Sequence, residues 1–462
     1  MNLDAYRQVW NDLPTDDGMF ARMEQWGNIY GGIPEWGVTR ARTVSKKFRR
    51  PLNLLNMGKL MCDEFAHRVF AAEQVDITTG NDTYDEWLAD LLNREGFWKC
   101  MPQFLSKAFA VGGGCIKEYI GDGRVRLNYI GGDYFYPVQW DNKEITGGIF
   151  GTNITKGKVY YTYLERHHYD NGTAFAERKL FRSSAQGVLG TEVDIGELFE
   201  LDEPPQTSVP CFQYFRPDIS NNLTDLMPLG ISCFANCTDT LKALDIAFDS
   251  FSREFILGKK RIIVPSSCIR TVVDPEDGKT VRYFDSDDEV YQALKCDDDR
   301  DLKIQDNTVA LRVEEHVSAI NSLLDILCMQ AGLSAGTFSF DSQQGMKTAT
   351  EVISQESKTA MTVKCHKNAL AEAIEGMCRA AFELAVQTGE LRPAEYELAV
   401  GFKDSIIIDD NQMIENNISL VAAGLKSKLT AIMEIMRCDE ETARKELGRI
   451  GGEMPVMGGM EI

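Results

Sequence analysis

Histidine is scarce in this chain, and its cysteines lack metal-binding spacing. Only five histidines occur among 462 residues, and none of the 12 cysteines forms a CxxC pair. His167 and His168 are adjacent in an expected β-strand, where neighbouring side chains point to opposite faces and so cannot share one metal ion. Cys233 and Cys237 are four apart on an expected helix, with no histidine following at ligand spacing. We therefore expect no metal centre and no cofactor, and reduced thiols in a protein that folds in the cytoplasm.

Long apolar runs and an excess of positive charge are also missing. No uninterrupted apolar stretch approaches the roughly 18 residues of a membrane-spanning helix, so we expect no contact with a membrane. The 49 lysines and arginines are outnumbered by 70 acidic residues, which gives a net charge of −21. This balance argues against a protein that coats nucleic acid, because tight phosphate binding needs an excess of basic residues. An acidic protein can still guide DNA that must slide, since like charge discourages sticking.

The glycine triplet at 112–114 resembles a phosphate-binding loop only superficially. It fits neither GxGxxG nor GxxxxGK[ST]. It also joins an expected helix to an expected strand, whereas phosphate-binding loops lead from a strand into a helix. We interpret the triplet as a helix C-cap and turn.

The N-terminal half mixes helix and strand, so we expect an α+β fold. Helices are expected over 54–72, 83–93 and 98–109, and short aromatic strands separated by turn dipeptides fill 115–215. Residues 36–62 carry seven basic residues and no acid. For this basic run three interpretations stay open: a solvated arm, a contact with nucleic acid, and a contact with an acidic neighbouring subunit.

The stretch 233–384 is expected to form a helix, a small β insert, a second helix, a loop and one long helix. Ser232 is the expected N-cap of the first helix, which ends at Gly258. Its apolar residues recur at steps of three and four, and Asp245 and Asp249 fall on the opposite side. Glu314 and Asp325 fall on the polar side of the second helix, 312–331. The long helix from 347 to about 386 would span roughly 60 Å, more than a compact enzyme domain usually needs.

The β insert contains the strongest acidic cluster. Residues 285–301 hold eight acids and two bases. The pattern of a calcium-binding loop, D-x-[DN]-x-[DN]-G, is absent. Solvated loop tips are one interpretation, and cation or partner binding is the other. After Pro393 a strand-like segment precedes helices over 411–449, with breaks near Gly424 and Cys438 and an expected cap at Asp439.

Several segments together resemble the portal proteins of tailed bacteriophages, in the branch typical of long non-contractile tails. The resemblance is carried by KKFRRPLNLLNMGKLMCDEFAHRVFAAE, PLGISCFANCTDTLKALDIAFDSFSREFILGKKRIIV, GLSAGTFSFDSQQGMKTATEVISQES and ISLVAAGLKSKLTAI. It covers most of the chain and rests on the order of elements rather than on a catalytic signature.

The resemblance implies a structural ring, usually of twelve subunits, at one vertex of the capsid. Double-stranded DNA would pass through it during packaging and ejection. The implied partners are the terminase large subunit, a head-completion adaptor, and the major capsid and scaffolding proteins. The ring would assemble in the cytoplasm of the host bacterium and become part of the virion. Twelve copies at −21 would carry a charge of about −250, which resists permanent adhesion of DNA.

The same resemblance implies a division of the chain. Its parts are a wing (1–228), a first stem helix (229–260), a clip (261–311), a second stem helix (312–332), a tunnel loop (333–347), a long wing helix with the following strand (348–410) and a crown (411–462).

Three groups of residues are the candidate functional residues. Residues of the tunnel loop would face DNA: Phe338, Ser339, Asp341, Gln343, Gln344 and Lys347. Helical spacing, rather than a family motif, puts four carboxylates on the stem faces that would line the channel: Asp245, Asp249, Glu314 and Asp325. In the clip, Asp297, Asp298 and Asp299 would form a docking surface.

Two other functions compete with a portal. A metal-dependent nuclease or phosphotransferase would use Asp285, Asp287, Asp288 or Asp297–Asp299 to bind Mg²⁺. Such a site usually draws its carboxylates from separate elements, whereas these acids lie in one segment. An adaptor ring is the other alternative, but we expect an adaptor to be smaller. We therefore expect a structural protein and no enzyme.

Overall fold

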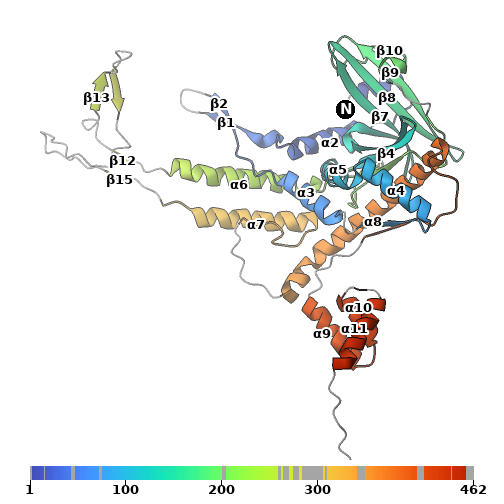
Figure 1. Ribbon diagram of the computed structural model, residues 1–462. Coiled ribbons are helices and arrows are strands. Elements are labelled where there is room, and N and C mark those ends of the chain that lie inside the picture. The colour runs from blue at the N-terminus through green and yellow to red at the C-terminus, as the bar shows by residue number, and fades with distance from the viewer. Residues whose placement is uncertain are drawn as a thin grey trace, which may run out of the picture.

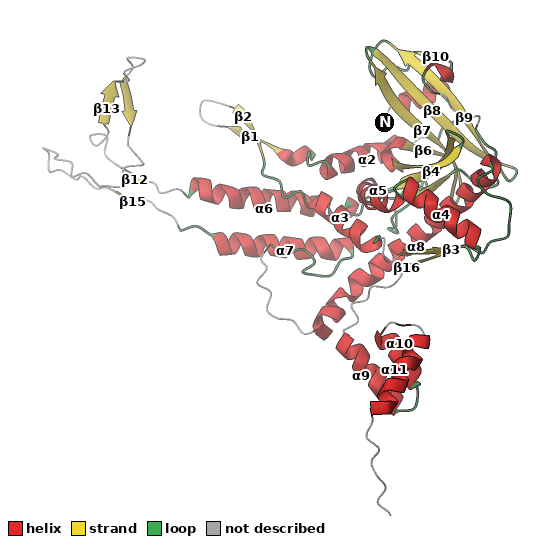
Figure 2. Cartoon of the chain, viewed as in Figure 1, coloured by secondary structure: helices red, strands yellow, loops and turns green. Residues whose placement is uncertain are grey.

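The computed structural model describes residues 3–14, 16–42, 47–71, 75–142, 144–199, 204–258, 262–263, 270–273, 280–283, 305–306, 310–340, 349–402, 410–436, 438 and 440–453. Figures 1 and 2 show a mixed helical and β part from which a pair of helices and a small helical unit extend. The mixture of helices and strands confirms the expected α+β class. No helix within these ranges is both long and apolar enough to cross a membrane.

Two antiparallel sheets form the β-rich part. The larger sheet has the order β10-β9-β8-β7-β6, and the smaller has the order β11-β4-β5. Their strands are β4 (Gly114–Gly121), β5 (Arg124–Gly131), β6 (Phe135–Asp141), β7 (Glu144–Lys156), β8 (Val159–Asp170), β9 (Thr173–Ser183), β10 (Thr191–Val193) and β11 (Phe212–Phe215). The expected β character of 115–215 is confirmed.

Helices pack beside the smaller sheet and share one large core with it. They are α1 (Leu3–Val9), α2 (Asp17–Tyr30), α3 (Met57–Val69), α4 (Asp82–Arg94) and α5 (Phe97–Val111). The last three match the helices expected over 54–72, 83–93 and 98–109. Between α2 and α3, within the basic run 36–62, the chain forms a two-stranded ribbon of β1 (Val38–Arg42) and β2 (Lys47–Pro51).

The glycine triplet is a helix cap, as expected. Gly112 ends α5 with a left-handed φ of 92°, and its N–H donates to the carbonyl of Ala108. A Cβ at Gly112 would lie 2.3 Å from the carbonyl oxygen of Gly230, so the close approach of these two backbone segments also requires glycine. The triplet therefore serves chain geometry and packing.

Two features of this region were predicted wrongly or not at all. The sequence did not single out β7, although it lies inside the larger sheet. Glycines interrupt the alternation of apolar and polar residues that marks a strand. Packing requires these glycines, because a Cβ at Gly148 would lie 2.2 Å from the ring of Phe135. Ser232 does not cap the following helix. It starts a short turn, and the α-helix begins only at Thr238.

The central helices are α6 (Thr238–Leu257) and α7 (Val313–Ala331). They run side by side away from the sheets, as Figure 1 shows. Beyond them, β12 (Ile262–Ile263) pairs with β15 (Gln305–Asp306), and β13 (Arg270–Val273) pairs with β14 (Thr280–Tyr283). Gly258 ends α6, and Gly332, with a φ of 77°, ends α7. Both helix ends were predicted.

The long helix α8 (Ala349–Thr388) contains 40 residues and confirms the expected element. Its buried side includes Leu370, Ile374, Met377 and Leu384. Just beyond its end, β16 (Ala399–Phe402) pairs with β3 (Val75–Thr78), which joins the two ends of the chain's main body.

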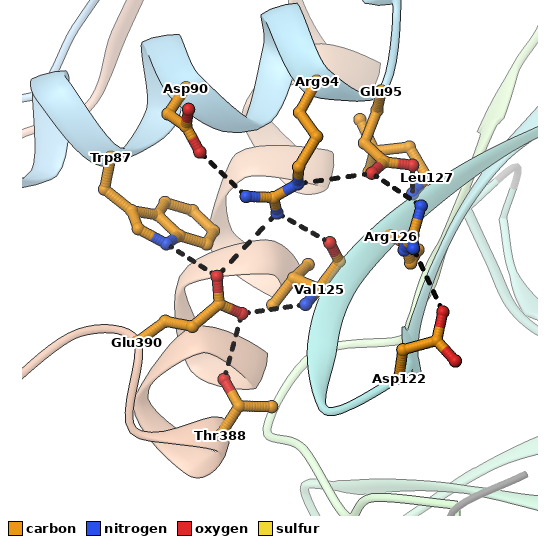
Figure 3. A network of polar contacts seen from close by, with 10 residues as sticks. All are labelled: Trp87, Asp90, Arg94, Glu95, Asp122, Val125, Arg126, Leu127, Thr388 and Glu390. Carbon is orange, nitrogen blue, oxygen red and sulfur yellow. Dashed lines mark hydrogen bonds and ion pairs between the residues drawn. The ribbon is translucent and has the colours of Figure 1, made fainter.

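A polar network fixes the far end of α8 (Figure 3). Glu390 accepts hydrogen bonds from the Trp87 indole at 3.3 Å and from the Val125 backbone N–H at 2.8 Å. Arg94 donates to the Val125 carbonyl at 3.0 Å and lies 3.8 Å from Glu390. Thr388 donates to the same carboxylate at 3.2 Å. Elements α4, β5 and α8 are thereby tied to one acidic side chain.

The last described residues form three helices, α9 (Asp410–Ala422), α10 (Lys428–Met436) and α11 (Glu440–Glu453). The expected break near Gly424 is confirmed by its φ of 70°. Ala431 and Ala443 are buried between these helices, while Ile418 and Leu425 are 61% and 77% exposed. Asp439, the expected cap of α11, lies outside the described residues.

Candidate functional site

The pair α6–α7 carries four of the candidate residues and is held together at both ends. At one end the Thr240 hydroxyl donates to Gln330 at 2.8 Å. At the other, Arg312 donates to Glu254 at 3.1 Å. Buried apolar side chains such as Leu244 fill the space between. The two helices therefore form a firm pair whose outer faces are fixed relative to each other.

Asp245 on α6 is buried, with 6% of its surface exposed. It accepts a hydrogen bond from the Trp36 indole at 2.8 Å and another from the Leu55 backbone N–H at 2.9 Å. Burial raises the pKa of Asp245, and these hydrogen bonds oppose the rise. This carboxylate holds the segment before α3 against α6.

Asp249, one helical turn further, is 4% exposed and has the same role. Both oxygens contact the Arg50 guanidinium, one of them at 2.8 Å, and the Asn53 backbone N–H donates at 3.1 Å. The Arg50 hydrogen bond lowers the pKa of Asp249. The expectation that Asp245 and Asp249 line a channel is therefore corrected, because both carboxylates are buried and bonded to the chain before α3 at Trp36, Arg50, Asn53 and Leu55.

Glu314 and Asp325 on α7 are exposed, as the sequence suggested. They are 11 residues apart, so they project within about 20° of each other around the helix. His316 and Gln330, which contact α6, lie on another side of α7. Counting about 100° per residue, Glu314 is about 160° from His316 and Asp325 about 140° from Gln330. The acidic line of α7 therefore faces away from α6.

The loop after α7 folds back on that helix. Asp325 accepts a hydrogen bond from the Gly336 N–H at 3.0 Å, and Asn321 accepts one from the Phe340 N–H at 2.8 Å. Phe338 is partly buried against the core, which corrects the expectation that it faces DNA. Ser339 is exposed. Sequence analysis does not indicate the tether made by Asn321, because it is one of several polar residues on the polar face of α7.

The remaining candidates lie outside the described residues. They are Asp341, Gln343, Gln344 and Lys347 of the loop, and Asp297, Asp298 and Asp299 of the insert. The acids of 285–301 that the nuclease hypothesis requires lie outside as well. Across the described part of the chain, no group of three or more His, Cys, Asp or Glu side chains is placed to hold a metal ion.

The loop also contacts the start of α8. The Ser334 N–H donates to the Thr359 hydroxyl at 2.8 Å, and the Thr362 hydroxyl donates to the Gly332 carbonyl at 2.8 Å. Ser334 and Thr359 are buried. The end of α7, the loop and α8 are thus joined by hydrogen bonds between backbone groups and threonine hydroxyls, which do not depend on charge.

A group of buried ionisable side chains lies where the two sheets meet. Lys117 contacts Glu165 at 2.7 Å, and His167 contacts the other oxygen of Glu165 at 2.8 Å. Burial lowers the pKa of His167. Glu118 is 1% exposed, and burial raises its pKa well above the usual range. His168, on the other face of β8, stacks on Phe175, so the two histidines are separated as expected.

A model of the phage portal proteins described as SPP1 Gp6-like matches residues 20–453. The chain belongs to this phage portal protein family. The match includes α6, α7, α8 and the strands between them. No curated protein matches the sequence.

Membership gives this portal protein a structural role in a bacteriophage, as a head–tail connector and a component of the virion capsid. The family implies a ring oligomer with capsid and packaging partners in general. The portal resemblance inferred from the sequence is confirmed. In the structure, two of the four predicted stem carboxylates, Asp245 and Asp249, are buried and hold the segment before α3, whereas Glu314 and Asp325 are exposed.

Proposed function

We propose that this portal protein forms a ring, with twelve subunits as the expected number, around a channel for double-stranded DNA at one capsid vertex. DNA passes through the channel during packaging and ejection. The terminase large subunit docks on the ring during packaging, and the head-completion adaptor replaces it afterwards. The observation that carries the proposal is the family match over residues 20–453.

The exposed apolar side chains of α6 and α7 support assembly. Ile246, Ile256 and Met329 are 48%, 62% and 62% exposed, although they lie on helices with buried apolar sides. Such side chains supply apolar area for contacts with another subunit. Neighbouring subunits in a ring would cover them.

In the proposed ring, 1–228 and 348–410 form the wing, and α6 and α7 form the stem. Residues 261–311 form the clip, with Asp297–Asp299 as its docking surface. Residues 333–347 form the tunnel loop, and 411–462 the crown. Of the four predicted stem carboxylates, Glu314 and Asp325 line the channel, since they are exposed on the side of α7 opposite α6. Within the loop, Ser339, Asp341, Gln343, Gln344 and Lys347 remain the proposed DNA-facing residues.

Electron microscopy of the purified protein tests the ring directly. We expect round particles with a central hole and cyclic symmetry at micromolar concentration. Size-exclusion chromatography with light scattering gives the mass of the same sample. A protein that stays monomeric at high concentration would rule out the proposed assembly.

A further inference from the structure

The basic run of the sequence forms the ribbon β1–β2, and one face of this ribbon is anchored. The register pairs Thr39 with Arg50, and Arg40 with Arg49. Arg50 extends to α6 and contacts both oxygens of the buried Asp249. Trp36, just before the ribbon, donates to Asp245 on the same side of α6. The base of the ribbon is therefore fixed to α6 through buried carboxylates.

The opposite face of the ribbon is exposed in the part of the chain that the structure describes. Successive residues of a strand point to opposite faces, so Val38, Arg40, Arg49 and Pro51 share the face that Arg50 does not use. All four are exposed, whereas Thr39 and Arg50 are half-buried. Val38 is paired with Pro51 and is 52% exposed. We call these four residues the outer ribbon face.

The outer ribbon face carries positive charge that no described residue compensates. Arg40 and Arg49 are direct cross-strand neighbours, a position in which like charges destabilise a β pair. Neither arginine makes an ion pair with a residue in the described ranges. A partner that brings carboxylates across this face would relieve the repulsion. Elsewhere the chain, at a net −21, repels an acidic partner.

The ribbon lies on the side of α6 that is turned away from α7. Thr240 and Glu254 of α6 contact α7, and Asp245 and Asp249 contact the ribbon segment. Asp245 is five residues after Thr240, and Glu254 five residues after Asp249, so each step is about 140° around the helix. If the acidic line of α7 faces the channel, the outer ribbon face lies on the outside of the ring. This step rests on the proposed function.

We propose that the outer ribbon face is a docking strip for an acidic, partly apolar segment of a different virion protein that surrounds the portal ring. Arg40 and Arg49 contact its carboxylates, and Val38 and Pro51 contact its apolar side chains. An acidic, partly apolar segment would therefore contact all four residues of the outer ribbon face. Duplex DNA presents phosphates but no apolar surface to match Val38 and Pro51, and the acidic ring repels it.

Site-specific cross-linking in assembled particles tests the proposal. Val38→p-benzoylphenylalanine places a photoreactive group within the strip, and mass spectrometry identifies what it captures. We expect a net-acidic segment of another virion protein. The variant R40E/R49E should lower the cross-linking yield by at least about tenfold, because reversed charges at an interface cost several kcal/mol. Charge reversal in the captured segment should restore the yield with R40E/R49E.

The matched control is R124E/K158E, which makes the same change of charge at two exposed cations outside the ribbon. Its yield should stay within about twofold of the unaltered ribbon, since it leaves the local contact intact. Capture of this same chain, capture of DNA, or equal yields with R40E/R49E and the control would each overturn the docking strip.

Electron microscopy of the same proteins distinguishes failure of the docking strip from failure of the proposed function. Absence of rings in the unaltered protein refutes the proposed function, whereas intact rings with equal yields refute only the docking strip.

Discussion

Glu118 on β4 is a carboxyl group in an environment that disfavours charge. It is 1% exposed, and neither of its oxygens has a hydrogen-bond partner among the described residues. The neighbouring Lys117 is engaged by Glu165 on β8. Burial raises the pKa of Glu118 well above its ordinary value, so the folded protein holds a proton that the unfolded chain releases.

This proton makes stability depend on pH in a defined direction. A carboxyl whose pKa is raised by folding stabilises the protein fully below the unfolded pKa of about 4.3 and loses that contribution as pH rises. We expect Glu118→Gln to raise the thermal unfolding midpoint more at pH 8 than at pH 5, as measured by scanning calorimetry. The exposed Glu144→Gln serves as control. Equal shifts for Glu118→Gln at both pH values would contradict a buried neutral carboxyl.

The acids of α6 show where residue-level prediction failed. Helical spacing correctly grouped Asp245 and Asp249 on one side, but it assigned that side to solvent. Their partners Trp36 and Arg50 are about 200 positions earlier in the chain, 209 and 199 residues away. Spacing within one helix contains no information about a segment that distant. On α7 the structure describes no such segment over Glu314 and Asp325, and their expected exposure is confirmed.

At the scale of elements, Glu390 connects the far end of the long helix α8 to α4 and β5. Its carboxylate accepts from the Val125 N–H at 2.8 Å, from Trp87 and from Thr388. Glu390→Gln replaces one acceptor oxygen with a donor and removes the charge that Arg94 faces. We expect a loss of about 1–3 kcal/mol in the free energy of unfolding, typical for hydrogen bonds to a charged group.

Hydrogen exchange measures this prediction locally. Amides of α4 and the first residues of β5 should exchange faster in Glu390→Gln, while those of α6 and α7 stay unchanged. Glu86→Gln, at an exposed position on α4, is the matched control. Unchanged protection of α4 and β5 would mean that Glu390 does not hold the end of α8.

Elements with strong periodicity and clear ends were predicted well. The helices α5, α7 and α8 have apolar sides at steps of three and four, and Gly112 and Gly332 mark where two of them stop. Strand β7 was overlooked because three glycines interrupt its pattern. At Gly151 a Cβ would lie 2.0 Å from the Tyr6 hydroxyl, a contact from α1 that local sequence does not indicate. Tertiary packing, rather than strand propensity, selected these residues.

At the scale of the whole molecule, the proposed ring places one exposed acidic line per subunit around the channel. Glu314→Gln together with Asp325→Asn removes two negative charges from each line. Asparagine keeps an oxygen that can accept the Gly336 hydrogen bond, so the loop tether is preserved. We expect rings to form normally but to retain DNA roughly two- to fivefold more at low ionic strength, because weaker repulsion favours adhesion.

Filter binding of short duplex DNA to purified rings at several salt concentrations measures this effect. The control is Glu144→Gln with Glu192→Gln, which removes the same charge from exposed positions on β7 and β10. The difference between the two double variants should vanish at high salt, where charges are screened. Equal retention by both at low salt would place the acidic line of α7 outside the channel.

The pairing of β3 with β16 has a consequence for protein synthesis. The Asn81 side chain beside β3 donates to the carbonyl of Glu395, 314 positions later. At about 5–20 residues per second, a ribosome needs roughly 15–60 s to make the intervening chain. Until then β3 has no partner strand, and α4 lacks the contacts of Glu390. A chain that stops before β16 therefore cannot complete the main body.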